Sequence, residues 1–456
     1  MPKTGGSIRV RTNDTSLWAT ARRHGPAIAV FLVATLCVVA FLTEHPVRET
    51  AGDEPTYFRL AVASEPLDPS LPTLLPGNMP LYWWPPLTFA LYGMMVTPAD
   101  LAPSAPRLPH DRHGMELATP ESFVRRVSLA NAVGMLVSGL LVYLIALQLG
   151  LSPPAATVAL AATTLNPRLL FYVQTLWPEW LHAVVLLSAM ALLVRFARDE
   201  GVAWLALASA LLGVAALIKG VTPGFMVVLI PALLVLCRGN DRLRLVSIAA
   251  AAVVPFALVT GPQLLRNHHE HGAFVLSTNT WINVEAGILP PPQARNPELE
   301  SVFDLYRRSA ADPITRERLS RERVVEHLTE ASPLGTLKRI ARNYWFSIRH
   351  SFFGGSVAGD RWEGSQGLTW MVPLVPVLSA LLFVVGIAGI VLSWRSHRAH
   401  VVLALFLVYY VLALGIVGFN PRFFVQAAPL LGIMAAFALD QAGSALRSKV
   451  RDTSSR

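Results

Sequence analysis

The sequence predicts an all-α integral membrane protein, and three features support this fold class. Apolar residues make up 53% of the 456 residues and charged residues 15%, whereas a soluble domain has about 25% charged residues. The apolar residues form runs that are long enough, or nearly so, to cross a bilayer as helices. The basic residues lie between these runs. This position indicates membrane anchoring of the loops rather than nucleic-acid binding, despite a net charge of +9.

About ten transmembrane helices are expected, and eleven or twelve remain open because several runs are short. The first run follows Arg22 and Arg23 and lacks a convincing small-residue cleavage site, so we expect an uncleaved anchor rather than a signal peptide. The expected spans lie at 27–43, 127–149, 153–173, 179–196, 202–218, 222–237, 245–263, 369–393, 400–418 and 423–441.

A further apolar run, at 81–97, is expected to lie in the membrane interface instead of crossing the membrane. Its Pro85–Pro86 pair would remove backbone hydrogen bonds near the start of a helix. Counting it as a span would also move every later basic cluster to the opposite side, against the positive-inside rule. With ten spans and a cytoplasmic N-terminus, the later cytoplasmic clusters are Arg195 and Arg198; Arg238, Arg242 and Arg244; Arg395 and Arg398; and Arg447, Lys449, Arg451 and Arg456.

Two long segments, at about 44–126 and 264–368, then face outward and are expected to carry interfacial helices. In the second, Asp312 is a suitable N-cap and Pro313 a suitable first helical residue. The stretch 333–353 combines apolar and basic residues as a helix on a membrane surface does. The predicted organisation is a cytoplasmic tail (1–26), a membrane core with the first outer loop (27–263), a large outer loop (264–368), C-terminal membrane helices (369–441) and a cytoplasmic tail (442–456).

An acid pair, Asp53 and Glu54 in AGDEPTYFRL, follows the first span on its outer side. Pro55 should keep Glu54 out of the helical region, and TYFRLAVA can then begin a helix with the acids near its positive end. A carboxylate there is stabilised in its ionised form, which suits a base or an electrostatic anchor. The alternative interpretation is a pair of solvated loop acids.

Three basic residues lie where apolar runs begin or end on the same outer side: Lys219 in ALIKGVTP, Arg266 in LLRNHHEHG and Arg422 in GFNPRFF. Each one alone is explained by a long basic side chain reaching the interface. Three of them on the side that carries the acid pair favour a shared anionic ligand. Glu179 in LWPEWLH also lies at the outer end of a span and could complete this polar cluster.

Other chemistry is less well supported. The HHEH stretch at 268–271 lacks the i,i+4 histidine spacing of a helical zinc site, so an interfacial polar turn is favoured over a metal site. Cys37 and Cys237 lie inside or at the end of apolar runs and support neither a disulfide framework nor a thiolate metal site. The absence of a Gly-rich phosphate loop, a nucleophile elbow and a dinucleotide fingerprint argues against a nucleotide donor or ATP.

These stretches resemble, in family order from residue 52 to about 431, the motifs of the GT-C glycosyltransferases. The resemblance is strongest to the glycosyltransferase family 39-like group related to protein mannosyltransferases and aminoarabinose lipid A transferases. AGDEPTYFRLA resembles its first acidic motif, YWWPPLTFALYG its Tyr-Pro-Pro-Leu segment and NPRFFVQAAPLL its closing segment. RNHHEHGAFVLSTNTWINVEAGI is the most specific match. IKG departs from the family's Leu-Thr-Arg-Pro, and 98–119 looks like an insertion.

The resemblance implies a GT-C-type helix bundle that moves a sugar from a polyprenyl-phosphate-linked donor to an acceptor on the periplasmic face of the bacterial inner membrane. Asp53, with Glu54 as second candidate, would be the catalytic carboxylate that orients or deprotonates the acceptor hydroxyl, and displacement at C1 would invert the anomeric centre. Arg266, Arg422 and Lys219 would bind the donor phosphate. Further residues expected to line the site are Glu179, Tyr57, Tyr82, Asn267 and Asn279.

The donor is a substrate, so no cofactor is expected, and no metal is assigned. The expected partners are the polyprenyl-phosphate sugar, an acceptor (lipid, glycan or protein) that the sequence does not identify, and the lipid bilayer. The alternatives are an enzyme like O-antigen ligases or polymerases of envelope polysaccharide and, less favoured, a secondary transporter.

Overall fold

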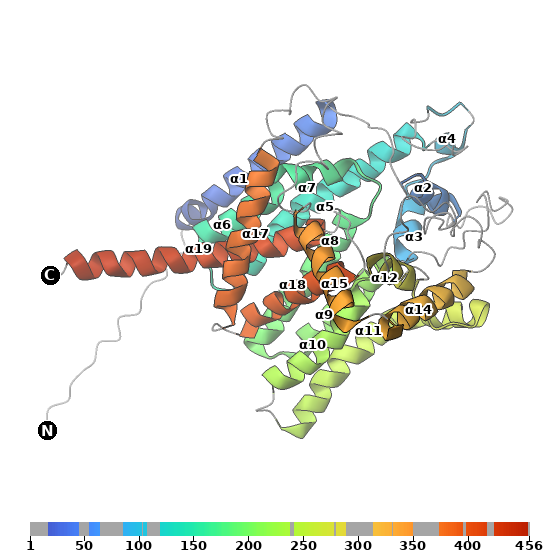
Figure 1. Cartoon of the computed structure of the whole chain (residues 1–456). Helices are drawn as coiled ribbons and strands as arrows, with labels where there is room; N and C mark the ends of the chain where they lie inside the picture. The colour runs from blue at the N-terminus through green and yellow to red at the C-terminus, as the bar shows by residue number, and fades with distance from the viewer. Residues whose placement is uncertain are drawn as a thin grey trace.

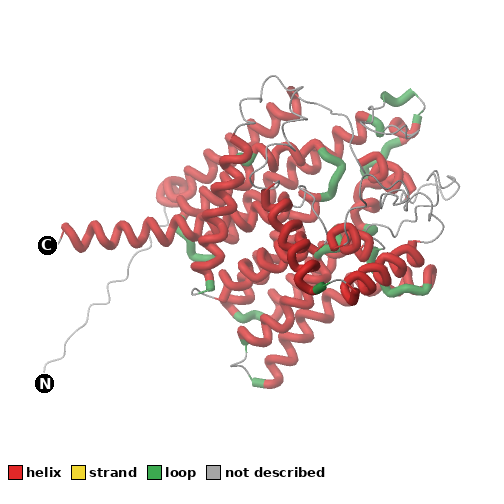
Figure 2. The backbone as a smooth tube through the Cα atoms, viewed as in Figure 1, coloured by secondary structure: helices red, strands yellow, loops and turns green. Residues whose placement is uncertain are grey.

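The computed structural model describes residues 17–44, 54–63, 85–102, 104–106, 119–237, 241–277, 280–288, 313–330, 332–349, 374–394, 398–416 and 424–454. Within these ranges the helices form a bundle around a shared apolar core (Figure 1). The segments between them are turns and loops, without strands in the described ranges (Figure 2). The predicted all-α membrane fold class is confirmed.

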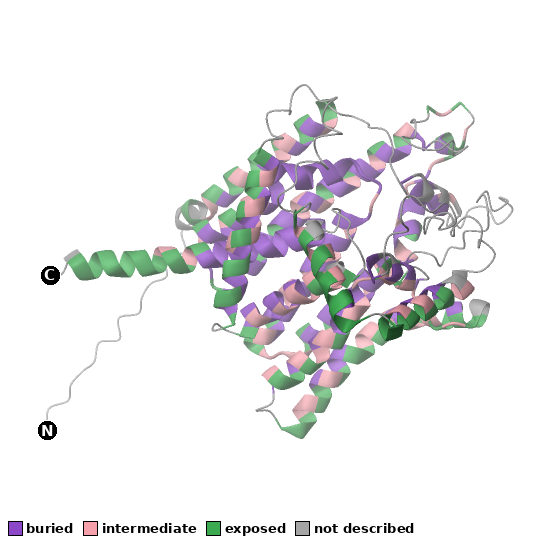
Figure 3. Cartoon of the chain, in the orientation of Figure 1, coloured by how far each residue is buried: buried purple, intermediate pink, exposed green. Residues whose placement is uncertain are grey.

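Six of the described helices are long and apolar enough to cross a membrane, and three shorter apolar helices accompany them. A helix suits a bilayer because its backbone hydrogen bonds are made within the segment. The last helix continues beyond the bundle, and its final part is exposed (Figure 3). The helices of the bundle are α1 (Leu17–Glu44), α5 (Glu121–Gln148), α6 (Pro153–Thr164), α8 (Glu179–Asp199), α9 (Val202–Ile218), α10 (Thr222–Leu236), α11 (Arg242–His271), α17 (Leu374–Ser393), α18 (Arg398–Ile416) and α19 (Phe424–Ser454).

The expected span at 153–173 is wrong as a single helix. After α6 the chain continues as the short helix α7 (Pro167–Phe171) and the 3₁₀ helix η1 (Tyr172–Gln174). Asn166 and Pro167 cause the break. The ring of Pro167 cannot continue α6, and the side chain of Asn166 caps α7 by accepting a hydrogen bond from the backbone N–H of Arg168.

The broken segment nevertheless extends through most of the bundle. Ser152, just before α6, lies next to the end of α5 at Gln148. At the other end of the segment, Asn131 of α5 donates hydrogen bonds to the carbonyl oxygens of Val173 and Thr175, at 3.3 and 2.7 Å. Asn131 precedes Gln148 by 17 positions (148 − 131), which corresponds to roughly 25 Å along α5.

Helix ends rich in basic residues meet at one face of the bundle, which we call the basic face. Glu200, which closes α8 in the left-handed region with φ of 52°, pairs with Arg244 of α11 at 2.8 Å and Arg398 of α18 at 3.1 Å. The Ser152 hydroxyl donates to Asp440 of α19 at 2.7 Å. The end of α8, the middle of α19 at Asp440 and the starts of α6, α11 and α18 therefore share this face. The positive-inside rule predicts that it is the cytoplasmic one.

The first outer loop packs against the opposite face. It contains α2 (Glu54–Ala63), α3 (Leu87–Gly93) and α4 (Pro98–Leu101). The Thr88 hydroxyl donates to the carbonyl oxygen of Ile218 at 3.1 Å and so ties α3 to the end of α9. With seven residues, α3 is too short to cross a bilayer. The expected interfacial segment at 81–97 accordingly contains no spanning helix in its described part, residues 85–97.

A buried carboxylate anchors this loop to α5. Asp100, which is 0% exposed, accepts hydrogen bonds from the backbone N–H and the hydroxyl of Thr97 at 2.7 and 2.8 Å, and also from Ser122 and Arg126. Burial raises the pKa of Asp100, but the hydrogen bonds from Ser122 and Thr97 and the charge of Arg126 outweigh it and hold the pKa below its ordinary value.

The second outer loop contributes α12 (Thr280–Ile288), α14 (Pro313–Glu330) and α15 (Pro333–Ile348). Helix α14 begins at Pro313, as expected, while the expected N-cap Asp312 lies outside the described residues. Tyr344 of α15 donates its hydroxyl proton to the carbonyl of Leu412 in α18, and Asn343 donates to Gly287 of α12. Within the second outer loop α15 is therefore tied to α12, and it attaches the loop to the bundle at α18.

The position of the helix ends leads to a labelling experiment on the two faces. In a Cys37→Ala/Cys237→Ala background, we expect Lys338→Cys in α15 to react with a membrane-impermeant maleimide in intact spheroplasts. We expect Lys449→Cys in α19 to react only after permeabilisation, because it lies beyond the basic face. Both lysines are exposed, so each variant is the control for the other. Equal labelling of the two in intact cells would contradict this topology.

The Asp100 cluster leads to a prediction about pH. A carboxyl whose pKa is lowered by folding stabilises the folded state above its unfolded pKa of about 3.9, and this contribution is lost as the pH falls through the folded value. We expect Asp100→Asn to lower stability at pH 7 by about 1–3 kcal/mol, with the difference in Tm from wild type shrinking below about pH 4. Thermal unfolding of the detergent-solubilised protein measures this difference, with the exposed Glu326→Gln as control.

Candidate functional site

A cavity of about 800 Å³ lies among the helix ends opposite the basic face. Its walls come from the start of α8, the junction between α9 and α10, parts of α11 and α18, the extended segment 273–277, and helices α12 and α14. Apolar residues on α11 and α18 form one part of the wall. The charged residues that line the cavity are Glu179, Lys219, Glu317, Arg318 and Arg321.

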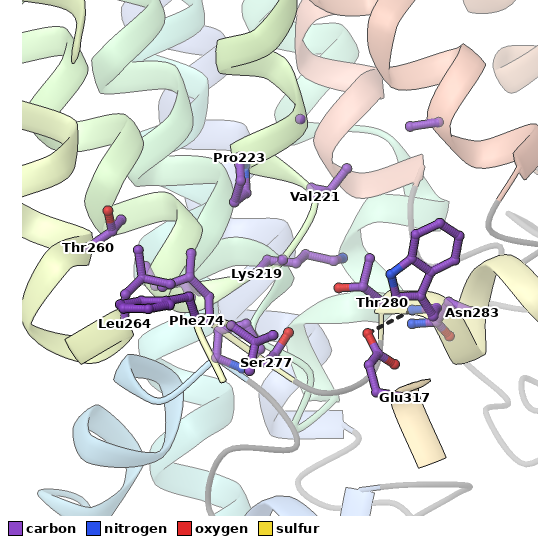
Figure 4. Close-up of a pocket in the computed structure, with 18 of the residues that line it drawn as sticks. Lys219, Val221, Pro223, Thr260, Leu264, Phe274, Ser277, Thr280, Asn283 and Glu317 are labelled. Carbon is purple, nitrogen blue, oxygen red and sulfur yellow. Dashed lines mark hydrogen bonds between the residues drawn. The ribbon is translucent and has the colours of Figure 1, made fainter. Parts of the chain in front are cut away.

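Glu179 and Lys219 meet at the membrane end of this cavity. Glu179 is the first residue of α8, where the helix dipole favours a carboxylate. Lys219 follows the last residue of α9 in an extended conformation. The Lys219 ammonium lies 2.8 Å from Oε1 of Glu179, and the two side chains are only 14% and 1% exposed. Figure 4 shows Lys219 extended across the cavity toward Thr280.

A second contact fixes the same junction one turn further along α8. His182, one turn after Glu179 in α8, shares a hydrogen bond of 3.0 Å with the hydroxyl of Thr222, the first residue of α10. Both residues are almost completely buried. The relative positions of α8, α9 and α10 are therefore set by an ion pair and a hydrogen bond at the level of the cavity.

Glu54 lies beside this junction. It is 1% exposed, and its Oε1 accepts a hydrogen bond of 2.8 Å from the backbone N–H of Leu176, three residues before Glu179. This burial excludes the solvated-acid interpretation for Glu54. The expectation that Pro55 keeps Glu54 out of the helix is wrong. Helix α2 begins at Glu54, because a proline in the first turn gives up an N–H that has no intrahelical acceptor.

Two tyrosines connect the acids with the cavity. Tyr57 of α2 lines the cavity, and the ring of Tyr92 in α3 lies behind it with centroids 6.4 Å apart. Burial, then the charge of Glu179, then that of Glu54 raise the pKa of Tyr92 well above its ordinary value. Tyr92 therefore remains a neutral phenol near both carboxylates. Sequence reasoning did not select it, although it belongs to the YWWPPLTFALYG stretch from which Tyr82 was chosen.

Asn267 acts on the cavity through the extended segment. Its side-chain amide donates to the carbonyl of Val275 at 2.6 Å and accepts from Gln263 at 2.8 Å. The chain turns into this segment at Gly272, whose φ of +73° suits a glycine at the end of a helix. Residues 273–277 then line the cavity. Asn267 is therefore placed to position one wall of the site.

The HHEH stretch ends α11. The imidazole of His268 stacks on Phe274, with centroids 3.9 Å apart and an interplanar angle of 11°. In the described part of the chain, no group of three or more His, Cys, Asp and Glu side chains is close enough to hold a metal ion. The side chains of Glu270 and His271 are outside that part.

Helices α12 and α14 form the wall of the cavity on the outer-loop side. Glu317, 7% exposed, accepts a hydrogen bond of 2.9 Å from the backbone N–H of Trp281 (Figure 4). Arg323 pairs with Glu285 at 3.3 Å. Arg321 lies over the Trp281 ring, 5.9 Å from its centroid. The sequence predicted the start of α14 but not the importance of its charged residues, because the helix that it packs against cannot be identified from the sequence.

The structure thus brings together Glu179, Lys219 and Tyr57, and places Glu54 and Asn267 next to them. Arg266 is an exposed residue of α11 that does not line the cavity. The roles assigned to all of these residues remain predictions. The other expected site residues, Asp53, Arg422, Tyr82 and Asn279, lie outside the described residues.

Solved structures of other proteins resemble this chain. No protein-family model and no curated protein matches it. The Archaeoglobus fulgidus oligosaccharyltransferase in its apo form matches with a TM-score of 0.51 and 16% identity over 94% of this chain and 52% of that chain. The same enzyme, AglB, in complex with an inhibitory peptide and a dolichol-phosphate, matches with a TM-score of 0.51 and 16% identity over 97% of this chain and 52% of that chain. ArnT from Cupriavidus metallidurans bound to undecaprenyl phosphate gives a TM-score of 0.39 and 17% identity over 90% and 77%.

The chain spans about half the length of the oligosaccharyltransferase structures it matches. The likeness shows that this chain shares the fold of the oligosaccharyltransferase structures, which agrees with the fold that the motifs suggested. Together with the apolar helices, it identifies a multi-pass membrane protein.

The ion pair at the cavity leads to a prediction about stability. Lys219→Met removes the ammonium partner of a buried carboxylate, which costs about 3 kcal/mol or more. The double variant Lys219→Met/Glu179→Gln removes both charges, so we expect it to recover most of this loss. Thermal unfolding in detergent measures the two Tm values. A double variant no more stable than Lys219→Met would show that the pair is not the source of the loss.

Proposed function

We propose that this chain is a glycosyltransferase that moves a sugar from a polyprenyl-phosphate-linked donor to an acceptor at the outer face of the bacterial inner membrane. The observation that carries the proposal is the cavity at the helix ends opposite the basic face. One part of its wall is apolar and the other carries the Glu179–Lys219 pair. A lipid-linked sugar has matching parts, namely an apolar chain, a phosphate and a polar sugar.

The comparison with AglB supports this class of donor. AglB was solved with a dolichol-phosphate, which is a lipid with one phosphate on a polyprenyl-type chain. In the present chain, Phe256 and Leu264 of α11 and Tyr409 of α18 provide apolar surface in the same cavity as Lys219. A lipid chain held there would leave its phosphate at the level of the helix ends.

Lys219 is the described residue best placed for the donor phosphate. Its ammonium already lies in the cavity and is largely shielded from water, so its charge acts more strongly on a bound anion than it would in bulk water. Neutralising the phosphate favours its departure from C1 of the sugar. Arg266 and Arg422 remain proposed contributors to the same role.

Asp53 is proposed as the residue that orients or deprotonates the acceptor hydroxyl, with inversion at C1. The contact of Glu54 supports this division of roles. Its carboxylate is buried and held by the backbone N–H of Leu176, which suits a residue that fixes the start of α2 beside the cavity. Asp53 precedes Glu54 in the sequence, and we propose that it acts on the acceptor beside the Glu179–Lys219 pair.

The position of the charges also bears on the alternatives. A secondary transporter binds its substrate near the middle of the membrane, between broken helices. Here Glu179 begins α8 and Lys219 follows α9, so both lie at helix ends. An envelope polysaccharide ligase or polymerase would share an outward-facing site, but the buried Glu54 next to the cavity has no evident use in it. We therefore favour transfer from a polyprenyl-phosphate sugar, without cofactor.

Lipid mass spectrometry tests the proposal. In a deletion strain complemented with Asp53→Asn, we expect a polyprenyl-phosphate sugar to accumulate as in the deletion strain, because loss of a general base lowers the rate by about 10²–10⁴-fold. Complementation with Glu326→Gln, an exposed acid of α14 that does not line the cavity, should restore the wild-type lipid profile. Normal lipids in the Asp53→Asn strain would remove Asp53 from this role. Normal lipids in the deletion strain would overturn the proposed reaction.

A further inference from the structure

Arg321 differs from the other cationic residues that line the cavity. Its guanidinium carbon lies 5.9 Å from the centroid of the Trp281 ring, an arrangement in which the ring face attracts the cation without using its N–H groups. In the described part of the chain Arg321 has no carboxylate partner. Its N–H groups are therefore available to a ligand in the cavity.

The neighbouring charges in the cavity are already balanced. Lys219 pairs with Glu179 at 2.8 Å, and Arg318 pairs with Glu322 one turn further along α14 at 3.1 Å. Among the cationic side chains that line the cavity in the described part of the chain, Arg321 is thus the one whose charge no ion pair offsets. A substrate group that binds it should be anionic.

The wall that carries Arg321 is built to hold its geometry. The backbone of Trp281 is fixed by the buried Glu317 at 2.9 Å, and Arg323 joins α14 to Glu285 of α12 at 3.3 Å. These two contacts lie on either side of Arg321 along α14, so the indole ring and the guanidinium are held in register. A site held in place in this way loses little conformational freedom on binding.

We propose that Trp281 and Arg321 form a saccharide subsite for a sugar that carries a carboxylate or phosphate group. The apolar face of a sugar ring would pack against the indole, and its anionic group would bind the guanidinium, which matches planar oxygen pairs with two parallel hydrogen bonds. The subsite rests on the proposed function only in that the ligand is taken to be a saccharide. Its two residues belong to α12 and α14, whereas Lys219 belongs to the α9–α10 junction.

The anionic sugar has two possible sources, the transferred sugar or the acceptor. The binding chemistry is the same for both, so it is tested first with simple probes. We would measure the binding of methyl β-D-glucuronide, glucose 6-phosphate and the neutral methyl β-D-glucoside to the full chain in lipid nanodiscs, by saturation-transfer NMR. We expect wild type to bind both charged sugars at least about fivefold more tightly than the neutral one.

Four variants test which residues are responsible. Arg321→Gln should abolish the preference for the charged sugars, while Trp281→Leu should weaken all three sugars. Arg342→Gln, which removes an exposed arginine of α15 away from the cavity, should keep the preference. A Tm of Arg321→Gln equal to that of wild type, measured in the same nanodiscs, confirms that the variant is folded. If its Tm is lower, Arg321→Lys replaces it. This variant keeps the positive charge but not the planar guanidinium, so it should show an intermediate preference. No preference in wild type, or an unchanged preference in Arg321→Gln, would overturn the proposal.

Undecaprenyl phosphate added as a competitor separates this subsite from the donor-phosphate site. If it displaces glucuronide and itself binds more weakly to Arg321→Gln, Arg321 binds the donor phosphate and the proposal is wrong. Simultaneous binding of both supports two separate positions. Since binding is measured without turnover, the result stands whether or not sugar transfer is detected in the lipid experiment.

The lipids of the Asp53→Asn strain then distinguish the two sources. An anionic sugar on the accumulated polyprenyl phosphate identifies the transferred sugar, and an anionic sugar present only on the unmodified glycoconjugate identifies the acceptor. Neutral sugars in both would overturn the assignment of the subsite.

Discussion

The ion pair between Glu179 and Lys219 is the contact on which the geometry of the cavity depends. It joins the first residue of α8 to the junction between α9 and α10, with both side chains largely buried. A buried charge is tolerated where a partner compensates its lost hydration, so the start of one helix and the end of another are held together. The first outer loop attaches to the same place, through Glu54 at Leu176 and through Thr88 at Ile218.

The bilayer imposes the second constraint, because charged groups are excluded from the hydrocarbon region unless they are paired. The two faces of the bundle meet this constraint differently. At the basic face, Glu200 pairs with Arg244 and Arg398, and these half-exposed ion pairs hold the end of α8 next to the starts of α11 and α18. At the opposite face the charges line a cavity. This asymmetry is what makes one face a candidate site and the other an anchor.

The sequence was sufficient to predict most of the helices and the two charged residues of the ion pair, because both depend on short stretches of sequence. Long apolar runs leave no other fold in a bilayer, and Glu179 and Lys219 stand at the ends of such runs. The sequence also contains the helix-breaking pair Asn166–Pro167, but the apolar composition of 153–173 led to the prediction of a single helix. By contrast, Tyr92 and Arg321 could not be found locally. Tyr92 depends on α3 docking against α9, and Arg321 on α14 packing against α12, and both are long-range contacts.

The charges at the cavity mouth limit how a donor phosphate could be bound. An ammonium has three N–H donors, so Lys219 could contact a phosphate while still holding Glu179. One positive charge, however, cannot balance a carboxylate and a phosphate together in a site of low dielectric. Under the proposed function, at least one more cation has to reach the phosphate. If Arg321 binds the anionic sugar, as proposed above, the side chains left to complete the charge balance at the donor phosphate are those of Arg422 and Arg266.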